Sequence, residues 1–461
     1  MRPTGCPASP SRSWPDPVIT LGIDVGTTHT KVLALDVERH AVLALESAPT
    51  PVVRDAEGEA HRPADLLETV FELVAAVSRA LPRAAAVRAL SVASVGEEVV
   101  LIDDTGAPVG DAIAWYDPRG LQEADRFQAG PGADLALTRR WPPDATFSLF
   151  KLLWLRDHAP ADLSRASAWT DVGDYVLHGL GGELVMDWSH ASRAGAFDLL
   201  EHAWDVPTIE AAGLELAFPR LVPGGEVVGT LLPQLARRLG LDDGLALVTG
   251  GHDHLCAAFG AGLRSTRELF LSAGTSEAHL SLRDSPLEGD AARGVDQGCY
   301  VDDHTWYWHV NIHSGHFFQQ WRELLFEGMA DDDMYAAVGA ADAAGIAFEI
   351  GDGLRLARLD AVPYDADRAT LMRAVLEGLA RHSAHIVARL ERAAGQPYEL
   401  LLVAGHPTGV PLWRELRRAV YERPMARVVE AEPTAFGAAV LAAQAIAPDA
   451  ARALSAGREQ W

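Results

Sequence analysis

The stretch GIDVGTTHTK combines residue types that phosphate and a metal ion require. Gly26 permits a tight turn, and the amides and hydroxyls of Thr27 and Thr28 could then surround phosphate oxygens. Asp24 could hold Mg²⁺ directly or through water, and Lys31 could offer a positive charge. The GxxxxGK[ST] pattern is absent and a strand is expected to follow, so this is not a Walker loop. An ordinary hairpin turn is the alternative.

A second glycine-threonine turn occurs in LSAGTSEAH. Gly274 and Thr275 could supply amide and hydroxyl donors to a transferring phosphoryl group. Taken alone, the stretch is more typical of a simple turn. One such loop in each half of the chain is, however, the arrangement that clamping a polyphosphate from both sides requires.

The stretch GGHDHLCAAFGAG places an acid between two histidines. Gly250 and Gly251 let the chain leave a strand sharply, and residues 255–261 can form a helix of small residues. Asp253 then lies near the N-terminus of that helix, where the helix dipole favours an anion. Such a carboxylate can accept a proton from a substrate hydroxyl, and phosphoryl transfer does not need a strong base. The alternative is an aspartate that only caps the helix.

Histidines are crowded between residues 252 and 316, namely His252, His254, His279, His304, His309, His313 and His316. The HExxH pattern is absent, and YWHVNIHSGH favours strand and loop over one helix. The spacing of metal ligands is therefore missing, and a transition-metal site is disfavoured.

An acid pair and an aromatic residue occur in SVGEEVVLIDDTGAPVGDAIAWYDPRG. Glu97, Glu98 and Asp117 could bind a polyhydroxylated ligand by hydrogen bonds, and Trp115 could stack on it. The alternative is that Trp115 belongs to the core and that the charges are solvated.

The elements that must position these residues follow from hydrophobic periodicity. VITLGID, KVLALD and AVLALES predict an antiparallel meander, and PADLLETVFELVAAVSRAL predicts an amphipathic helix. LALVTGG, ELFLSAGTSEAHLSL and ELLLVAGHPTGVPLWRELRRAV bring a related pattern into the second half. We therefore expect two similar α/β lobes that face one another across a cleft.

The domain boundary is expected near residues 243–249. The resulting organisation is a disordered leader at residues 1–17, an N-terminal lobe at 18–246, a C-terminal lobe at 247–446 and a tail at 447–461. The leader lacks the apolar region of a signal peptide.

Charge and composition exclude several functions. The 461 residues carry 39 Lys and Arg against 64 Asp and Glu, for a net charge of -25, which disfavours nucleic acid and anionic lipid as partners. No apolar run approaches the ~20 residues that span a bilayer. Cys6, Cys256 and Cys299 form no CxxC pair, which favours a reducing compartment. We expect a cytoplasmic protein.

Together these stretches resemble the FGGY family of carbohydrate kinases from Val18 to about Ala445. GIDVGTTHTK and AGTS resemble the two phosphate loops of the family, AIAWYDPR its substrate segment and GGHDH its catalytic-aspartate segment. FSLFKLLWLRDH matches a family signature, and VAGHPTGVPLW with EPTAFGAAVLAA resembles the adenosine region.

The resemblance implies an actin-like, ribonuclease H-like fold and transfer of the ATP γ-phosphoryl group to a hydroxyl of a sugar or polyol. It makes Asp253 a general base that also caps its helix, and Asp24 the carboxylate associated with Mg²⁺. It further implies that nucleotide phosphates contact Thr27, Thr28, Gly274 and Thr275, that Gly405 lies at the nucleotide, and that the sugar pocket is lined by Glu97, Trp115, Asp117 and His254. A homodimer is plausible by resemblance.

Two departures from the family pattern bear on function. His406 and Pro407 follow Gly405 where consecutive glycines are usual, and Pro407 removes an amide donor. That change motivates an alternative, a catalytically silent sugar- or nucleotide-sensing protein on the same fold, although Asp253 and both Gly-Thr loops argue against it. A chaperone-type or filament ATPase is disfavoured by FKLLWLRDH. Gly96-Glu97-Glu98 differs from the patterns of glycerol kinases and xylulokinases, so the sequence does not identify the sugar.

Overall fold

The structure is a computed structural model of the chain. It describes residues 18–54, 56–82, 86–133, 135, 145–274, 276–287, 295–302, 305–343, 345–351 and 357–461. The leader expected at residues 1–17 lies outside these ranges.

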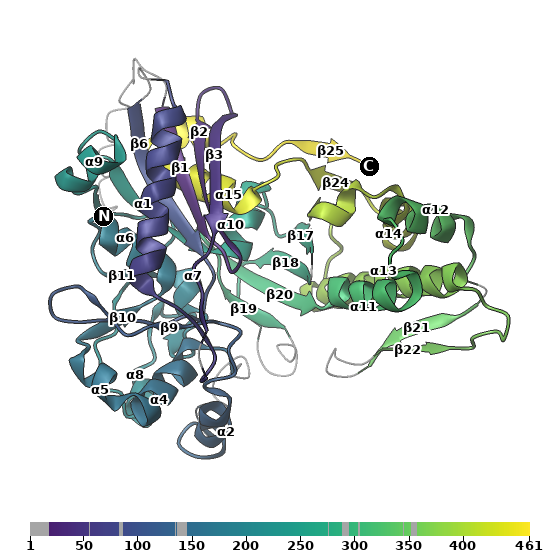
Figure 1. Cartoon of the computed structure of the whole chain (residues 1–461), viewed down its shortest axis with the longest axis horizontal. Coiled ribbons are helices and arrows are strands. Elements are labelled where there is room, and N and C mark those ends of the chain that lie inside the picture. The colour runs from purple at the N-terminus through teal and green to yellow at the C-terminus, as the bar shows by residue number, and fades with distance from the viewer. Residues whose placement is uncertain are drawn as a thin grey trace, which may run out of the picture.

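The N-terminal half is built on a mixed six-stranded sheet (Figure 1). Its order is β15-β16-β6-β1-β2-β3, with β1 (Val18–Val25), β2 (His29–Asp36), β3 (Ala41–Pro49), β6 (Ala86–Ser94), β15 (Val227–Thr230) and β16 (Ala246–His252). The strands β1, β2 and β3 pair antiparallel, while β6 joins β1 in parallel and β16 joins β6 in parallel. The antiparallel meander expected at the start of the chain is therefore confirmed.

The C-terminal half repeats this topology in a seven-stranded sheet. Its order is β19-β20-β18-β17-β23-β24-β25, with β17 (Glu268–Ala273), β18 (Glu277–Arg283), β19 (Asp296–Cys299), β20 (Trp306–Ile312), β23 (Leu400–Ala404), β24 (Met425–Val428) and β25 (Arg458–Gln460). The β17–β18 hairpin corresponds to β1–β2, since β20 again pairs antiparallel on its outer side and β23 and β24 follow in parallel on the other. Two similar α/β lobes are thus confirmed.

Helices cover both faces of each sheet, which explains why all of β1 is buried. Alternate residues of a strand point to opposite faces. Leu21 and Ile23 face the outer helices α1 (Pro63–Ala80), α6 (Val172–Leu180) and α9 (Pro233–Leu239). The hydroxyl of Thr20 instead donates to the carbonyl of Ala439 on the opposite face, 2.8 Å away.

Two helices lie between the lobes and join their cores (Figure 1). They are α10 (Asp253–Gly260) and α15 (Pro433–Ile446), and one hydrophobic cluster contains their apolar residues together with Leu35 of the first sheet and Phe270 of the second. The helices pack so closely at Gly437 that a Cβ there would lie 1.9 Å from the carbonyl oxygen of Cys256. The outer face of the second sheet is covered by α13 (Arg368–Ala394) and α14 (Pro411–Tyr421).

Smaller elements extend each lobe. Below the first sheet in Figure 1 lies a smaller part of the N-terminal lobe that has a hydrophobic core of its own. Its helices are α2 (Leu121–Ala129), α4 (Ser148–His158), α5 (Pro160–Arg165), α7 (Trp188–Ala191) and α8 (Val206–Ala212). Its short strands are β4 (Val53–Arg54), β5 (Glu59–His61), β7 (Val100–Ile102), β8 (Pro108–Val109), β9 (Ala112–Ile113), β10 (Ala168–Thr170), β11 (Val185–Asp187), β12 (Phe197–Asp198), β13 (Ala203–Trp204) and β14 (Arg220–Val222). The C-terminal lobe adds α11 (Ser314–Phe326), α12 (Asp331–Ala340), β21 (Ala347–Ile350), β22 (Ala357–Asp360), the 3-10 turn η2 (His406–Gly409) and α16 (Pro448–Ala451).

The expected lobe boundary at 246/247 and the expected tail at 447–461 both fall within elements of the two sheets. The boundary at 246/247 falls at the start of β16, and that strand pairs with β6 as far as His252, so it is part of the first sheet. Residues 447–461, expected as a tail, contain α16 and the strand β25, which pairs antiparallel with β24. The segment is therefore integrated into the second sheet. The lobe bounds themselves stay predictions.

Candidate active site

Asp24 and the first glycine-threonine loop lie at the end of β1, at the inner side of the first lobe. Asp24 is buried, and its partner in the β1–β2 register is Lys31. The Lys31 ammonium lies 3.9 Å from the Asp24 carboxylate and donates to Glu432 at 2.5 Å. Glu432 immediately precedes α15, so this helix brings a third charge from the far end of the chain. Lys31 is thus held between two acids.

The two threonines of this loop differ in what they face. Thr27 lines a cavity of about 260 Å³, and its hydroxyl accepts a hydrogen bond from the indole Nε1 of Trp115 at 2.9 Å. Thr28 is exposed, is not among the lining residues, and its carbonyl accepts the amide of Thr50. A contact between Thr28 and phosphate stays a prediction.

Asp253 is the first residue of α10, directly after β16. Its neighbour His252 occupies the N-cap position, so Asp253 is not the N-cap residue. Its Oδ1 nevertheless accepts the backbone amide of His254 at 2.6 Å, and the Nδ1 of His252 lies 2.9 Å from the same oxygen. The carboxylate therefore satisfies a helix amide while it remains half-buried in the lining of the 260 Å³ cavity.

The two aspartates differ strongly in acidity. Burial, and then the charge of Asp253, raise the pKa of Asp24 to about 7, against the opposing charge of Lys31. Burial would also raise the pKa of Asp253, but the charges of His254 and His252 outweigh it and hold that pKa well below the usual range. Asp253 is therefore a carboxylate at neutral pH, whereas Asp24 shares its counter-charge, Lys31, with Glu432.

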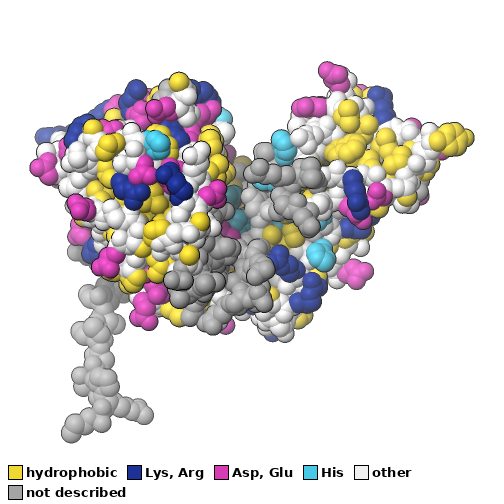
Figure 2. Space-filling model, turned by 90° about the horizontal axis from the view of Figure 1, so that it is seen from below, with side chains coloured by type: hydrophobic (Ala, Val, Ile, Leu, Met, Phe, Trp, Pro, Cys, Tyr) yellow, Lys and Arg dark blue, Asp and Glu magenta, His cyan; other side chains and the backbone are white. Residues whose placement is uncertain are grey.

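The substrate-binding residues expected from sequence mostly share this cavity. Glu97, Trp115, Asp253 and His254 all line it. The backbone around Trp115 is fixed from two sides, because its amide donates to Glu98 at 3.1 Å and the buried Lys151 donates to its carbonyl at 3.4 Å. Figure 2 shows the molecule hollowed between its two halves.

Asp117 is the exception, and its expected place in the sugar pocket stays a prediction. It is not among the residues that line the cavity. Its Oδ1 accepts the backbone amide and Nε of Arg119, and its Oδ2 accepts the amide of Glu59 at 2.6 Å. Because both oxygens accept hydrogen bonds within a local turn, Asp117 holds the segment that carries Trp115.

Sequence reasoning missed several residues of this cavity. The lining also contains Arg193, which follows α7, and Asp296, Tyr307, His309 and Asn311 on β19 and β20. Arg193 contacts Glu97 and Asp296, which are 96 and 103 positions away. No local pattern links such distant residues. The only signals in the sequence were that Arg193 follows a short helix and that Asp296 is a charged residue at the start of a strand.

A second, larger cavity lies in the C-terminal lobe. Its volume is about 570 Å³, and its wall is mainly apolar and aromatic, with Phe318, Tyr335, Leu376, Leu379, Trp413 and Leu416. Gly274 of the second glycine-threonine loop also lines it, while Thr275 lies outside the described residues. A cavity of this size and character suits an aromatic ring system.

The loop that departs from the family pattern lies at this cavity. Gly405 has a φ of 104°, and a Cβ at this position would lie 1.9 Å from the carbonyl oxygen of Ala273, so only glycine lets β23 end this close to β17. His406 and Pro407 line the cavity and open the turn η2. Pro407 thus occupies an early helical position, where a missing amide costs little.

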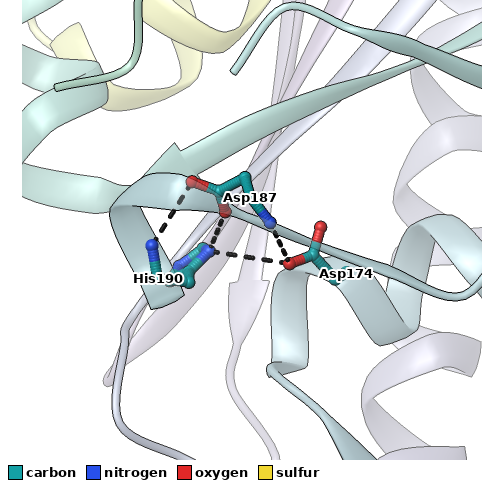
Figure 3. A group of neighbouring side chains, drawn as sticks. All are labelled: Asp174, Asp187 and His190. Carbon is teal, nitrogen blue, oxygen red and sulfur yellow. Dashed lines mark hydrogen bonds and ion pairs between the residues drawn. The ribbon is translucent and has the colours of Figure 1, made fainter. Parts of the chain in front are cut away.

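A buried group of acids and a histidine supports the turn before Asp253 (Figure 3). Asp174, Asp187 and His190 bring their side chains together, and among the described residues they alone form a group of metal-ligand type. The Asp187 carboxylate already accepts from His190 and from Ser189, whose hydroxyl in turn accepts the amide of His252 at 2.9 Å. The group therefore holds the N-cap of α10. His304 lies outside the described residues, and no described histidine between 252 and 316 belongs to a metal-ligand group.

The repeated sheet topology, with a hairpin loop at the inner end of each lobe, defines an actin-like, ribonuclease H-like fold. The N-terminal domain model of the FGGY family of carbohydrate kinases matches residues 19–260, and the C-terminal domain model matches residues 362–446. The chain belongs to this family. It is a carbohydrate kinase, an enzyme that transfers a phosphoryl group from ATP to a sugar hydroxyl.

Individual relatives are similar over most of their length. A xylulose kinase of Staphylococcus epidermidis is 24% identical over 443 residues, which cover 92% of this chain and 87% of the relative. An L-fuculokinase of Escherichia coli is 27% identical over 377 residues, which cover 77% and 76%. The ligand-bound xylulose kinase from Lactobacillus acidophilus shares the fold with a TM-score of 0.87 at 19% identity, over 96% of this chain and 93% of that one. None of the helices in the described ranges is long and apolar enough to span a bilayer.

Proposed function

We propose that this kinase phosphorylates a sugar or polyol in the 260 Å³ cavity, with Asp253 as the general base. The observation that carries the proposal is that Asp253 and Thr27, which follow the separate strands β16 and β1, line one cavity. A base and a phosphate loop must meet at the same space for an alcohol to attack a phosphoryl group.

In the proposed reaction the substrate hydroxyl donates a hydrogen bond to the Asp253 carboxylate. As the hydroxyl oxygen forms its bond to the γ-phosphorus, the bond from that phosphorus to the β-γ bridging oxygen breaks and ADP leaves. The hydroxyl proton passes to Asp253. A carboxylate of low pKa serves here because the proton is released late, when the attacking oxygen has become acidic.

The nucleotide is proposed to lie with its base in the 570 Å³ cavity and its phosphates toward Thr27 and Gly274. Asp24 is the residue proposed to hold Mg²⁺, which would neutralise phosphate charge. The chemistry of Asp24 fits this role, because carboxylate oxygens are the ligands that Mg²⁺ prefers. Burial raises the pKa of Asp24 to about 7, and a bound cation would stabilise its ionised form. The Lys31 ammonium, 3.9 Å from the Asp24 carboxylate, would add a second positive charge beside the phosphates.

The test of the base is Asp253→Asn, with Asp253→Ala as a second variant. Loss of a general base lowers kcat about 10²–10⁴-fold. Turnover is measured as ADP release over pentuloses, hexuloses, aldoses and polyols from tetritols to hexitols. Near-normal turnover of the best substrate by either variant would contradict the role of Asp253.

Asp198→Asn is a matched control. Asp198 is exposed, and its Oδ1 accepts the amides of Leu200 and Glu201, which an asparagine oxygen can also do. This variant removes one negative charge in the same lobe and should keep full activity.

The compartment and assembly are finer proposals. A cytoplasmic location fits the two free, buried thiols of Cys256 and Cys299, which a reducing environment preserves. A homodimer stays a prediction, and analytical ultracentrifugation would test it.

A further inference from the structure

One arginine in the substrate cavity is held between two carboxylates from different lobes. The Nε of Arg193 donates to Oε1 of Glu97 at 2.5 Å, and its Nη1 contacts the carboxylate of Asp296 on β19. The guanidinium lies over the ring of Phe147, with 5.0 Å to the ring centroid. The Nε and Nη1 groups of Arg193 are therefore already paired with protein carboxylates, which compete with a ligand carboxylate for the guanidinium.

Glu97 is held in place at a conformational cost. Its φ is 64°, in the left-handed region that residues other than glycine rarely adopt. Gly96 before it cannot carry a side chain, since a Cβ would lie 2.7 Å from Cδ2 of His252. Strained backbone conformations of this kind cluster at active sites and ligand-binding sites.

The charge balance of the cavity is negative. Glu97, Asp253 and Asp296 are three carboxylates against the single guanidinium of Arg193. Burial raises the pKa of Asp296, but Arg193 outweighs it and lowers that pKa to about 2. The charge of Asp253 raises the pKa of His254, but burial and the neighbouring charges of His252 and His309 outweigh it and keep that pKa below its usual value.

We infer that Glu97, Arg193 and Asp296 form a charge filter that restricts the acceptor to uncharged sugars and polyols and rejects aldonates and uronates. The inference rests on the proposed function, because it concerns the acceptor of that reaction. Hydroxyl groups can donate to the free lone pairs of Glu97 and Asp296, whereas a carboxylate would meet net negative charge in a half-buried space.

The first test compares acceptors of matched shape on the wild-type enzyme. Hexitols and pentitols are paired with the hexonates and pentonates of the same carbon configuration, for example D-glucitol with D-gluconate. We expect kcat/KM to be at least about 100-fold lower for the carboxylate of each pair with an active polyol, and the ratio to shrink as salt is added. A ratio below about tenfold at low salt would overturn the inference.

The second test frees the arginine. In Glu97→Gln/Asp296→Asn both carboxylates become neutral amides, and Arg193 becomes available to an anion. The preference for the polyol should fall at least about tenfold relative to wild type, because the cavity gains two units of positive charge. An unchanged preference in a folded double variant would contradict the filter. Glu201→Gln, an exposed residue of the same lobe, is the control for loss of surface charge and should keep the wild-type ratio.

Failure of the inference can be told from failure of the proposed function. If carboxylates are phosphorylated well and Asp253→Asn abolishes that activity, only the charge filter is wrong. Binding is also measured by isothermal titration calorimetry with Asp253→Asn, which needs no turnover. Tighter binding of a hexonate than of its hexitol would overturn the filter even if Asp253 proved not to be the base.

Discussion

At the scale of single residues, the two aspartates of the site stand in opposite electrostatic conditions. Asp253 lies at a helix N-terminus between two histidines, which favour its ionised form. Asp24 is buried near that carboxylate, with only the shared Lys31 to offset the repulsion. Asp253 is therefore ionised and suited to accept a substrate proton, whereas the ionised form of Asp24 would be stabilised by a bound cation.

The raised pKa of Asp24 predicts a specific dependence of stability on pH. The carboxyl titrates at 3.8 in the unfolded chain and at about 7 in the folded one, so the folded protein binds the extra proton between these values. The stabilising contribution is complete below pH 3.8 and is lost as pH rises through 7, a change on the order of 4 kcal/mol. Without nucleotide or metal, Asp24→Asn should be more stable than wild type by about 1.5 kcal/mol at pH 5 and by about 4 kcal/mol at pH 8.

Denaturant unfolding at the two pH values measures this difference, and titration with Mg²⁺ and ADP measures the function. The same variant should bind the Mg²⁺–ADP pair more weakly. Equal stability differences at pH 5 and pH 8 would mean that Asp24 does not titrate near neutrality.

Local patterns predicted the residues whose partners are near in sequence. Asp24 and Lys31 face each other because they flank one hairpin, and Asp253 directly follows a strand that ends in Gly-Gly-His. Arg193, Asp296 and Glu432 were beyond reach, since each meets its partner only through tertiary packing. A contact between Asp117 and a sugar stays a prediction, and the use of its carboxylate by the Arg119 turn depends on local geometry that the sequence does not show.

At the scale of elements, the site depends on how closely α10 approaches α15. Asp253 begins α10, and Glu432 immediately precedes α15, so the distance between these helices sets the spacing of the charged groups. The small residues of EPTAFGAAVLAA make that contact possible. The sequence showed the small residues and the hairpins, but the sandwich of both helices between two sheets needs the strand order, which no local pattern contains.

Gly437→Ala tests this contact. The added Cβ would lie 1.9 Å from the carbonyl oxygen of Cys256, so the helices must separate, at a cost of about 1–3 kcal/mol. We expect lower stability in denaturant unfolding and a lower kcat, because the shift moves Asp253. Gly339→Ala is the control, since it lies in α12 with nothing within 4 Å of its Cβ and should gain up to about 1 kcal/mol. Unchanged stability of Gly437→Ala would mean that the helices are not in this contact.

At the scale of the whole molecule, the two lobes share one core. The cluster around α10 and α15 includes Leu33 and Leu35 from the first sheet and Phe270 and Leu402 from the second. Each lobe also has clusters of its own, so the molecule consists of two similar bodies with a common buried joint. Lobes that only touched at a polar surface could unfold separately.

The shared core predicts that the lobes unfold together and that a ligand of one stabilises both. Calorimetric unfolding should show a single transition, and saturating Mg²⁺–ADP should move all of it, with about 2.7 kcal/mol gained at one hundred times the Kd. Trp413→Ala, in the wall of the 570 Å³ cavity, should remove the shift and keep the single transition. Two transitions of which only one responds to ADP would show that the buried joint does not couple the lobes. Nucleotide binding would then leave the stability of α10, the helix that carries Asp253, unchanged.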